Sequence, residues 1–147
     1  IRLSLVGSEM CIRDSSKTVV MDSKKHDKIF SMTSHLPHLI AYNLVKSAQD
    51  FEKKQRYNLI KYSAGGLRDF SRIAASNEIM WRDIFFNNKT NVSKAIDIFV
   101  KNLHSFKRDI ISGNSKSVIK KLTQTKKVRS KIVKLKQDTS KPDFGRN

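Results

Sequence analysis

The stretch Asn91-Val-Ser-Lys-Ala-Ile-Asp-Ile-Phe-Val-Lys-Asn-Leu-His-Ser-Phe-Lys-Arg-Asp-Ile110 contains the strongest periodic pattern in the chain. Its apolar residues step by four, three, four, three and four positions, at Val92, Ile96, Phe99, Leu103, Phe106 and Ile110. This near-heptad spacing places them on one face of a long helix, which Gly113 is placed to end as a C-terminal cap. The apolar face packs either inside one domain or against a partner subunit, and the pattern leaves both open.

Helix signals also precede this stretch. Asp22 is a good N-cap for a helix that runs to Met32. Pro37 should kink or restart that helix, with Ser34 as the cap of the next one. The next helix carries an apolar stripe at Leu36, Ile40, Leu44, Ala48 and Phe51.

Further helix boundaries follow on both sides of the long stretch. Two glycines permit backbone torsions that other residues rarely adopt, and a short helix should follow them. The boundary residues are Gly65 and Gly66, then Ser76 or Asn77 as a cap, Asn87-Asn88 as a stop, and Ser115 as the start of the last helix. Because no convincing alternating strand occurs, the sequence predicts an all-α fold.

The composition indicates one basic domain. Among 147 residues, 30 Lys and Arg face 13 Asp and Glu, which gives a net charge of +17. No run approaches the roughly 18 apolar residues of a membrane-spanning helix, so we expect no membrane segment and a cytoplasmic protein. The one cysteine, Cys11, excludes an intramolecular disulfide framework.

The positive charge is concentrated near the end of the chain. Residues 114–147 contain 11 basic and 2 acidic side chains, more than half of the net excess. Such a segment makes a basic helical nucleic-acid-binding module the alternative function. However, no aromatic residue that could stack on a base lies among the lysines of residues 116–136.

The two ends of the chain are set apart from the domain. Residues 1–15 resemble a translated sequencing-adapter artefact, and the alternative is a disordered terminus or an incoming strand. We exclude them from the functional argument. Residues 16–136 are expected to form the helical domain, and residues 137–147 a polar tail.

The sequence lacks the motifs of several common nucleotide-binding and metal-binding sites. The five glycines, at positions 7, 65, 66, 113 and 145, can form neither a dinucleotide fingerprint nor a P-loop. His35 and His38 are three residues apart and His26 is near, but no acidic residue lies in positions 28–49 to complete a metal site. We therefore expect no metal site on this chain.

A cluster of arginines lies in residues 65–82. Arg68 and Arg72 are four residues apart, so they can point the same way from a helix. Two guanidinium groups on one side favour a ligand with carboxylates, which they bind in bidentate fashion. The alternative is a surface ion pair between Asp69 and Arg72, with Trp81 in the core.

Several motifs make the chain recognisable. They are His26-Asp27, Ser34-His-Leu-Pro-His-Leu-Ile-Ala-Tyr42, Gly65-Gly-Leu-Arg-Asp-Phe-Ser-Arg-Ile-Ala-Ala-Ser76, Met80-Trp-Arg-Asp-Ile-Phe85 and Gln137-Asp-Thr-Ser-Lys-Pro-Asp-Phe-Gly-Arg146. In order and spacing they resemble the C-terminal helical domain of prephenate dehydrogenases, including the cyclohexadienyl and arogenate dehydrogenases of tyrosine biosynthesis. The resemblance covers roughly residues 17–147.

The resemblance implies an enzyme of two parts. A nucleotide-binding Rossmann domain comes first, and an all-helical domain follows that forms a homodimer and closes the substrate cleft. The implied reaction is oxidative decarboxylation of prephenate or arogenate with NAD or NADP. The family's catalytic histidine belongs to the first part, which this chain does not match. We therefore expect a truncated chain that is inactive alone.

The resemblance also implies six substrate-site residues: His38, Gly65, Arg68, Asp69, Arg72 and Trp81. Arg72 matches the arginine that holds a substrate carboxylate, and His38 matches a histidine near the substrate's side-chain end. Arg68 and Asp69 match positions that reach the neighbouring subunit's cleft, while Gly65 and Trp81 match positions lining the pocket. Arg68 is lysine in some relatives and Leu67 is often aromatic, which puts the shape of the cleft in doubt.

Overall fold

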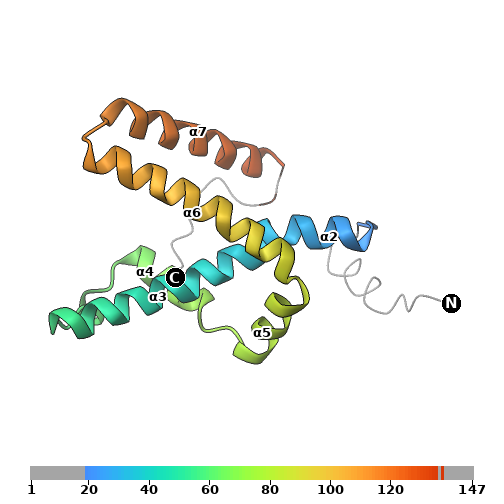
Figure 1. The fold of residues 1–147 in the computed structure, drawn as a ribbon, viewed down its shortest axis with the longest axis horizontal. Coiled ribbons are helices and arrows are strands. Elements are labelled where there is room, and N and C mark those ends of the chain that lie inside the picture. The colour runs from blue at the N-terminus through green and yellow to red at the C-terminus, as the bar shows by residue number, and fades with distance from the viewer. Residues whose placement is uncertain (1–18, 136, 138–147) are drawn as a thin grey trace.

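The computed structural model describes residues 19–135 together with Gln137, and these residues form helices and connecting turns without a strand (Figure 1). The expected all-α fold is confirmed. Residues 1–15, and the expected tail beyond Gln137, lie outside the described residues. The α-helices are α2 (Ser23–Phe30), α3 (Leu36–Gln55), α4 (Gly65–Ile73), α5 (Glu78–Asn87), α6 (Lys89–Ile111) and α7 (Ser115–Lys134).

A π-helical segment, Ser31–His35, joins α2 to α3. Asp22 caps α2 as expected, its carboxylate accepting a 3.1 Å hydrogen bond from the Lys25 N–H. The expectation that Ser34 caps a new helix is wrong, because the helix does not stop there. Instead the Leu36 N–H donates to the Ser31 carbonyl, five residues back, so the wider turn carries the chain past Pro37 without a break.

Helix α4 begins at Gly65 itself. The expected unusual torsions are absent, because neither Gly65 nor Gly66 has a positive φ. The left-handed residue of this region is Arg56, with φ 56°, which ends α3. A 3-10 turn, Ile60–Tyr62, then leads the chain back so that α4 packs along α3.

The remaining helix boundaries follow the sequence closely. Asn77 caps α5, its side-chain oxygen accepting a 2.8 Å hydrogen bond from the Met80 N–H. Gly113 has φ 66° and follows α6, as the C-terminal cap prediction requires. The Asn114 N–H closes that turn by donating to the Asp109 carbonyl at 2.8 Å, and α7 then starts at Ser115.

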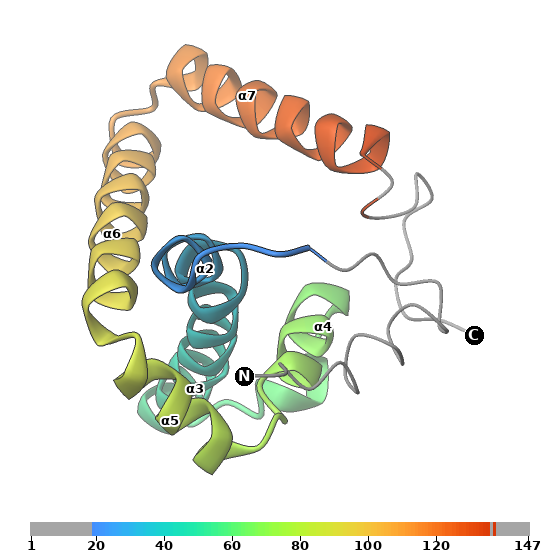
Figure 2. The same cartoon turned by 90° about the vertical axis from the view of Figure 1, so that its right-hand side faces the viewer.

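Helices α6 and α7 form a hairpin held by Asp109. Its Oδ2 atom accepts hydrogen bonds from the Ser117 hydroxyl at 2.5 Å and the Lys121 ammonium group at 2.6 Å. These two donors, Lys121 first, lower the pKa of the Asp109 carboxyl. Helix α7 packs on α6 and lies apart from α3 and α4 in both views (Figure 2).

The buried core is small and lies where α3, α5 and α6 meet. Its apolar members are Leu36, Ala41, Trp81, Val92 and Ala95. The periodic face of α6 therefore divides: Val92 is 5% exposed, whereas Leu103 is 56% and Ile110 is 67% exposed. The first half packs inside the chain. In the second half Phe106 is partly covered by α7, whereas Leu103 and Ile110 are left exposed.

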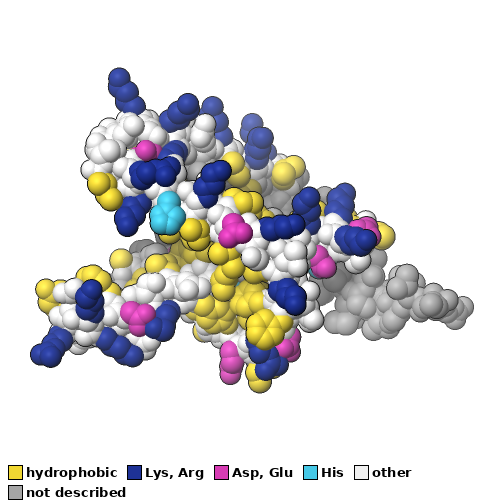
Figure 3. All heavy atoms as spheres, viewed as in Figure 1, with side chains coloured by type: hydrophobic (Ala, Val, Ile, Leu, Met, Phe, Trp, Pro, Cys, Tyr) yellow, Lys and Arg dark blue, Asp and Glu magenta, His cyan; other side chains and the backbone are white. Residues whose placement is uncertain are grey.

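Uncovered apolar side chains continue along α6 and onto α7, at Ile98, Val100, Ile111, Ile119, Leu122, Val128 and Ile132. Figure 3 shows hydrophobic side chains along the middle of one face, with Lys and Arg crowded over α7. None of the described helices is both long and apolar enough to cross a membrane. An apolar surface of this extent is typical of a protein interface.

Candidate functional site

Trp81 is the centre of the candidate site. It lies on α5, is 6% exposed, and its indole stacks on the imidazole of His38 from α3, with ring centroids 3.8 Å apart. The His38 Nδ1–H donates to the Ser34 carbonyl at 3.0 Å, which fixes the ring. The indole N–H of Trp81 is buried without a hydrogen-bond acceptor among the described residues. The structure thus brings together two of the six expected site residues.

A second histidine, His35, also packs against Trp81. The His35 ring meets the indole edge-on, with centroids 6.2 Å apart and planes at 77°. Asn88, 7% exposed, lies 3.3 Å from His35, measured from its side-chain nitrogen to Nδ1. Burial lowers the pKa of His35, the Asp27 charge opposes this, and the two nearby histidines add to the lowering.

Asn88 was missed by the sequence analysis, which assigned it only to the end of a helix. Its amide nitrogen also donates to the Asp27 carbonyl at 2.7 Å, and its amide oxygen accepts from Asn91 at 2.7 Å. It is the C-cap of α5 and the N-cap of α6. The one sequence signal for Asn88 was the Asn-Asn pair between two helical patterns, because its partners Asp27 and His35 lie 61 and 53 residues away.

Helix α4 carries the other four expected residues, Gly65, Arg68, Asp69 and Arg72. Arg68 and Arg72 are exposed and Asp69 is half-buried. In the part of the chain that the structure describes, none of these three side chains forms an ion pair or a hydrogen bond. The alternative ion pair between Asp69 and Arg72 is therefore absent, although Trp81 does lie in the core.

The two groups of residues flank α3 but do not touch. Tyr42, on α3, donates its hydroxyl to the Ser76 carbonyl at 2.8 Å and so ties α3 to the turn between α4 and α5. Within residues 19–135, no side-chain hydrogen bond, ion pair or ring contact joins the α4 group to His38 or Trp81. Two free guanidinium groups can bind an anion at α4, and the His38–Trp81 pair can bind a planar group or an acceptor.

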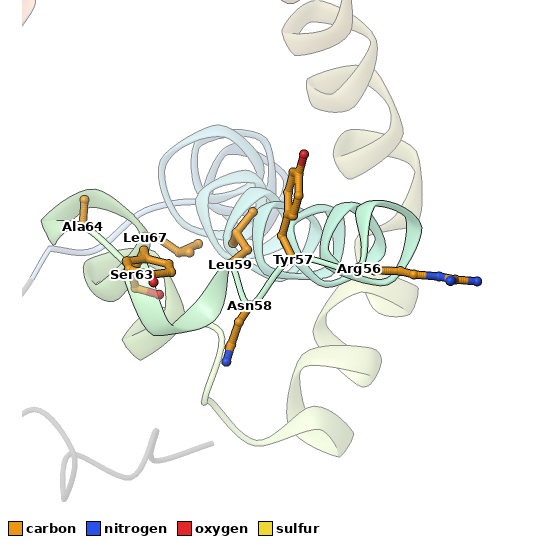
Figure 4. Close-up of a pocket in the computed structure, with 8 residues that line it drawn as sticks. Arg56, Tyr57, Asn58, Leu59, Ser63, Ala64 and Leu67 are labelled. Carbon is orange, nitrogen blue, oxygen red and sulfur yellow. The ribbon is translucent and has the colours of Figure 1, made fainter.

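Two cavities lie beside α4. One, of about 550 Å³, lies between the end of α3 and the start of α4, with Leu59 and Leu67 on its apolar wall (Figure 4). The Arg56 side chain points away from it. A neighbouring cavity of about 360 Å³ shares Ser63 and Leu67 with the first. None of the six expected site residues lines either cavity.

The described residues have neither a metal-ligand cluster nor a nucleotide-binding motif. Within residues 19–135, no group of three or more His, Cys, Asp and Glu side chains is placed to hold a metal ion. The same residues contain no strand, and therefore no strand, glycine turn and helix that could hold a dinucleotide pyrophosphate.

Residues 22–135 match the protein family described as prephenate dehydrogenase, dimerization domain. The chain belongs to this family. It is 34% identical over 110 residues to the cyclohexadienyl dehydrogenase of Zymomonas mobilis, covering 75% of this chain and 38% of that protein. It is 32% identical over 115 residues to the prephenate dehydrogenase of Lactococcus lactis, covering 78% of this chain and 32% of that protein.

The fold agrees with that of a solved prephenate dehydrogenase. The enzyme from A. aeolicus, in complex with hydroxyphenyl propionate and NAD+, superimposes with a TM-score of 0.74 at 38% sequence identity. The match covers 87% of this chain and 45% of that one. This prephenate dehydrogenase dimerization domain thus spans about a third of the curated relatives, at 38% and 32% of their lengths.

Proposed function

We propose that the chain is the substrate-binding and dimerisation domain of a prephenate or arogenate dehydrogenase, which oxidatively decarboxylates its substrate with NAD or NADP. The observation that carries the proposal is the family match over residues 22–135. It is supported by two arginines on α4 that have no ion-pair or hydrogen-bond partner among the described residues. Prephenate has two carboxylates, and arogenate has two carboxylates and an ammonium group, so either substrate requires fixed cations.

Helix α4 supplies those cations. Arg72 holds a substrate carboxylate through its planar fork, and Arg68, one turn earlier, adds a second positive charge. Neither guanidinium is neutralised by a neighbour among the described residues, so both remain available to the ligand. Asp69, also unpaired among the described residues, would reach the cleft of the neighbouring subunit.

The His38–Trp81 pair forms the other wall of the proposed site. A buried indole N–H without an acceptor is costly, and a substrate oxygen would satisfy it. The His38 Nδ1–H is already used by the Ser34 carbonyl, so Nε2 is the nitrogen that can meet the substrate. Gly65 begins α4 and has no side chain that could obstruct a ligand.

The cofactor supplies the hydride acceptor when it is bound, but the described residues do not fit it, because they contain no nucleotide cradle. No step of hydride transfer is therefore assigned to them. Their contribution is to bind and orient the substrate, which is a large part of catalysis when the driving force is aromatisation and loss of carbon dioxide.

The proposed function includes a homodimer. The uncovered apolar halves of α6 and α7 would be buried between two subunits, which accounts for exposed residues such as Leu103 and Ile119. The small core of the single chain has the same explanation, because many obligate dimers have no stable folded monomer.

The test uses the complete reading frame that contains this chain. Production of NADH or NADPH should be measured with prephenate and with arogenate, and the chain alone serves as the inactive control. Activity with either substrate supports the proposal. A folded, dimeric full-length protein that oxidises neither substrate would overturn it.

A further inference from the structure

The buried side chain of Asn88 has a defined orientation. Its amide nitrogen lies 2.7 Å from the Asp27 carbonyl, and its amide oxygen lies 2.7 Å from the Asn91 amide nitrogen. Turning the amide over would place oxygen against the Asp27 carbonyl and nitrogen against a donor. The Asp27 carbonyl, which can only accept, therefore sets the orientation, and the Asn91 amide is compatible with it. The nitrogen side faces His35.

This orientation determines where the proton of His35 lies. The amide nitrogen of Asn88 can only donate, so the His35 Nδ1 atom, 3.3 Å away, must accept. A neutral imidazole that accepts at Nδ1 carries its proton on Nε2. The same ring then packs edge-on against Trp81, which in turn stacks on His38.

We propose that Asn88 is a positioning residue: it holds His35 as the neutral tautomer protonated on Nε2, and through His35 and Trp81 it fixes the ring of His38. Asn88 touches no substrate in this proposal. The role of His38 toward substrate rests on the proposed function, whereas the arrangement of Asn88, His35 and Trp81 does not.

Charged groups around His35 come from three helices. Asp27 and His26 face it from α2, His38 from α3, and Asp83 from α5 lines the same cavity of about 400 Å³. Burial opposes a positive charge on His35, Asp27 favours one, and the other histidines disfavour it. A substitution that places a carboxylate at position 88 should therefore change the protonation of His35 strongly.

The first experiment needs no substitution. Long-range proton–nitrogen correlations of the histidine rings, recorded on the full chain near pH 7.5 and assigned with His35→Gln, report which ring nitrogen carries the proton. We expect the His35 Nδ1 to be unprotonated and Nε2 to be protonated. A His35 ring protonated on Nδ1 would overturn the proposal.

The second experiment compares Asn88→Asp with Asn87→Asp. Both add one negative charge at the end of α5. Asn87 lines the same cavity, but its side chain is exposed and forms no hydrogen bond to His35. Asp is also a good helix N-cap, so α6 keeps a favourable start. The chain has a single tryptophan, and a protonated imidazole quenches indole emission, so the pH profile of Trp81 fluorescence reports on its histidine neighbours.

We expect Asn88→Asp to raise the midpoint of that profile by about one pH unit or more, because a carboxylate stabilises the imidazolium. Asn87→Asp should move it by less than about 0.3, because an exposed charge is screened. Equal shifts in the two variants, or none in Asn88→Asp, would overturn the proposal. If Asn88→Asp does not fold, the tautomer measurement decides.

The link to His38 has its own readout. Ring protons of His38 lie over the face of the Trp81 indole and should be shifted upfield. We expect this shielding to decrease in Asn88→Asp and to remain in Asn87→Asp. Unchanged shielding in Asn88→Asp would overturn the link. None of these measurements uses substrate, so their failure would leave the proposed dehydrogenase function standing.

Discussion

The imidazole of His38 lies on the indole of Trp81, with ring centroids 3.8 Å apart and planes inclined by only 21°. The two residues are 43 positions apart in the sequence and come from α3 and α5. Their stack joins a structural core residue to a proposed substrate-site residue, so the stability of the fold and the geometry of the site depend on the same contact.

Replacing Trp81 with alanine should therefore destabilise the chain substantially. Loss of a large buried aromatic side chain costs about 3–5 kcal/mol, part of it for the cavity left behind. Urea unfolding followed by circular dichroism measures the change. The matched control is Arg82→Ala, whose side chain is exposed and pairs with Asp83, and it should change the free energy of unfolding by less than about 1 kcal/mol.

Replacing Leu103 with aspartate should separate the proposed dimer. Leu103 is 56% exposed in the single chain, so the carboxylate is tolerated there, but it would be buried unpaired between subunits. We expect the dissociation constant to rise on the order of 100-fold or more, measured by sedimentation. Lys101→Asp on the same helix is the control. A dimer of unchanged affinity in Leu103→Asp would contradict the proposed interface.

Phe99→Asp should have a different outcome from Leu103→Asp. Phe99 is half-buried within the chain, so a carboxylate there disrupts intrachain packing as well as the dimer. We expect loss of both dimer and cooperative unfolding in circular dichroism melts. A folded Phe99→Asp monomer would show that this part of α6 is less important to the core than its burial indicates.

Arg72→Ala should impair substrate binding in the complete enzyme. A bidentate, charge-assisted contact is worth on the order of 2–4 kcal/mol, which corresponds to roughly 30- to 1000-fold in kcat/KM. The KM for cofactor should barely change, and Arg72→Lys should restore part of the loss. Arg82→Ala removes the same charge elsewhere and should have little effect. An unaltered kcat/KM together with a lower free energy of unfolding would make Arg72 a structural residue.

The α6–α7 hairpin should loosen in acid. The hydrogen bonds from Lys121 and Ser117 lower the pKa of Asp109 below the ordinary 3.8. The carboxylate therefore binds protons more weakly in the folded chain than in the unfolded chain. The stabilisation is complete above about pH 3.8 and is lost as the pH falls through the folded-state pKa. Hydrogen exchange of the α7 amides should show this. Asp109→Asn should have a weaker hairpin at neutral pH and no such dependence.

His35 should make stability fall in the mildly acidic range. Burial lowers its folded-state pKa below 6.5, so the unfolded chain binds the proton more tightly. The free energy of unfolding is unaffected well above pH 6.5, decreases below it, and levels off once the pH is below the folded-state pKa. His35→Gln should remove this part of the profile in urea titrations. His104→Gln, at an exposed position of α6, should retain it.

Features encoded within a few residues were predictable from the sequence. Asp22, Asn77 and Gly113 act as caps because their chemistry suits one local backbone geometry. The apolar periodicity of α6 also predicted a long helix. It did not indicate whether the same chain or a partner subunit covers the apolar face. Val92 is buried within the chain whereas Ile110 is exposed, so the two halves of the helix differ in what covers them.

Features that depend on distant segments were not predictable. The Asn88 contacts and the His38–Trp81 stack require three helices to be placed first. The sequence placed Arg68 and Arg72 on one helix, yet it could not tell whether Asp69 would neutralise one of them. Pro37 was correctly identified as a disturbance, but a wider helical turn accommodates it instead of a new start.

That wider turn also sets the rotational phase between two helices. A π-helical segment is equivalent to one extra residue in an α-helix, which turns everything beyond it by about 100°. Removing one residue from Ser31–His35 would shorten the segment to a regular helix and rotate α2 about its axis relative to α3. The Asp27 carbonyl would then face away from Asn88. A single-residue deletion in this segment is therefore more damaging than a substitution of its exposed residues, Met32 and Thr33.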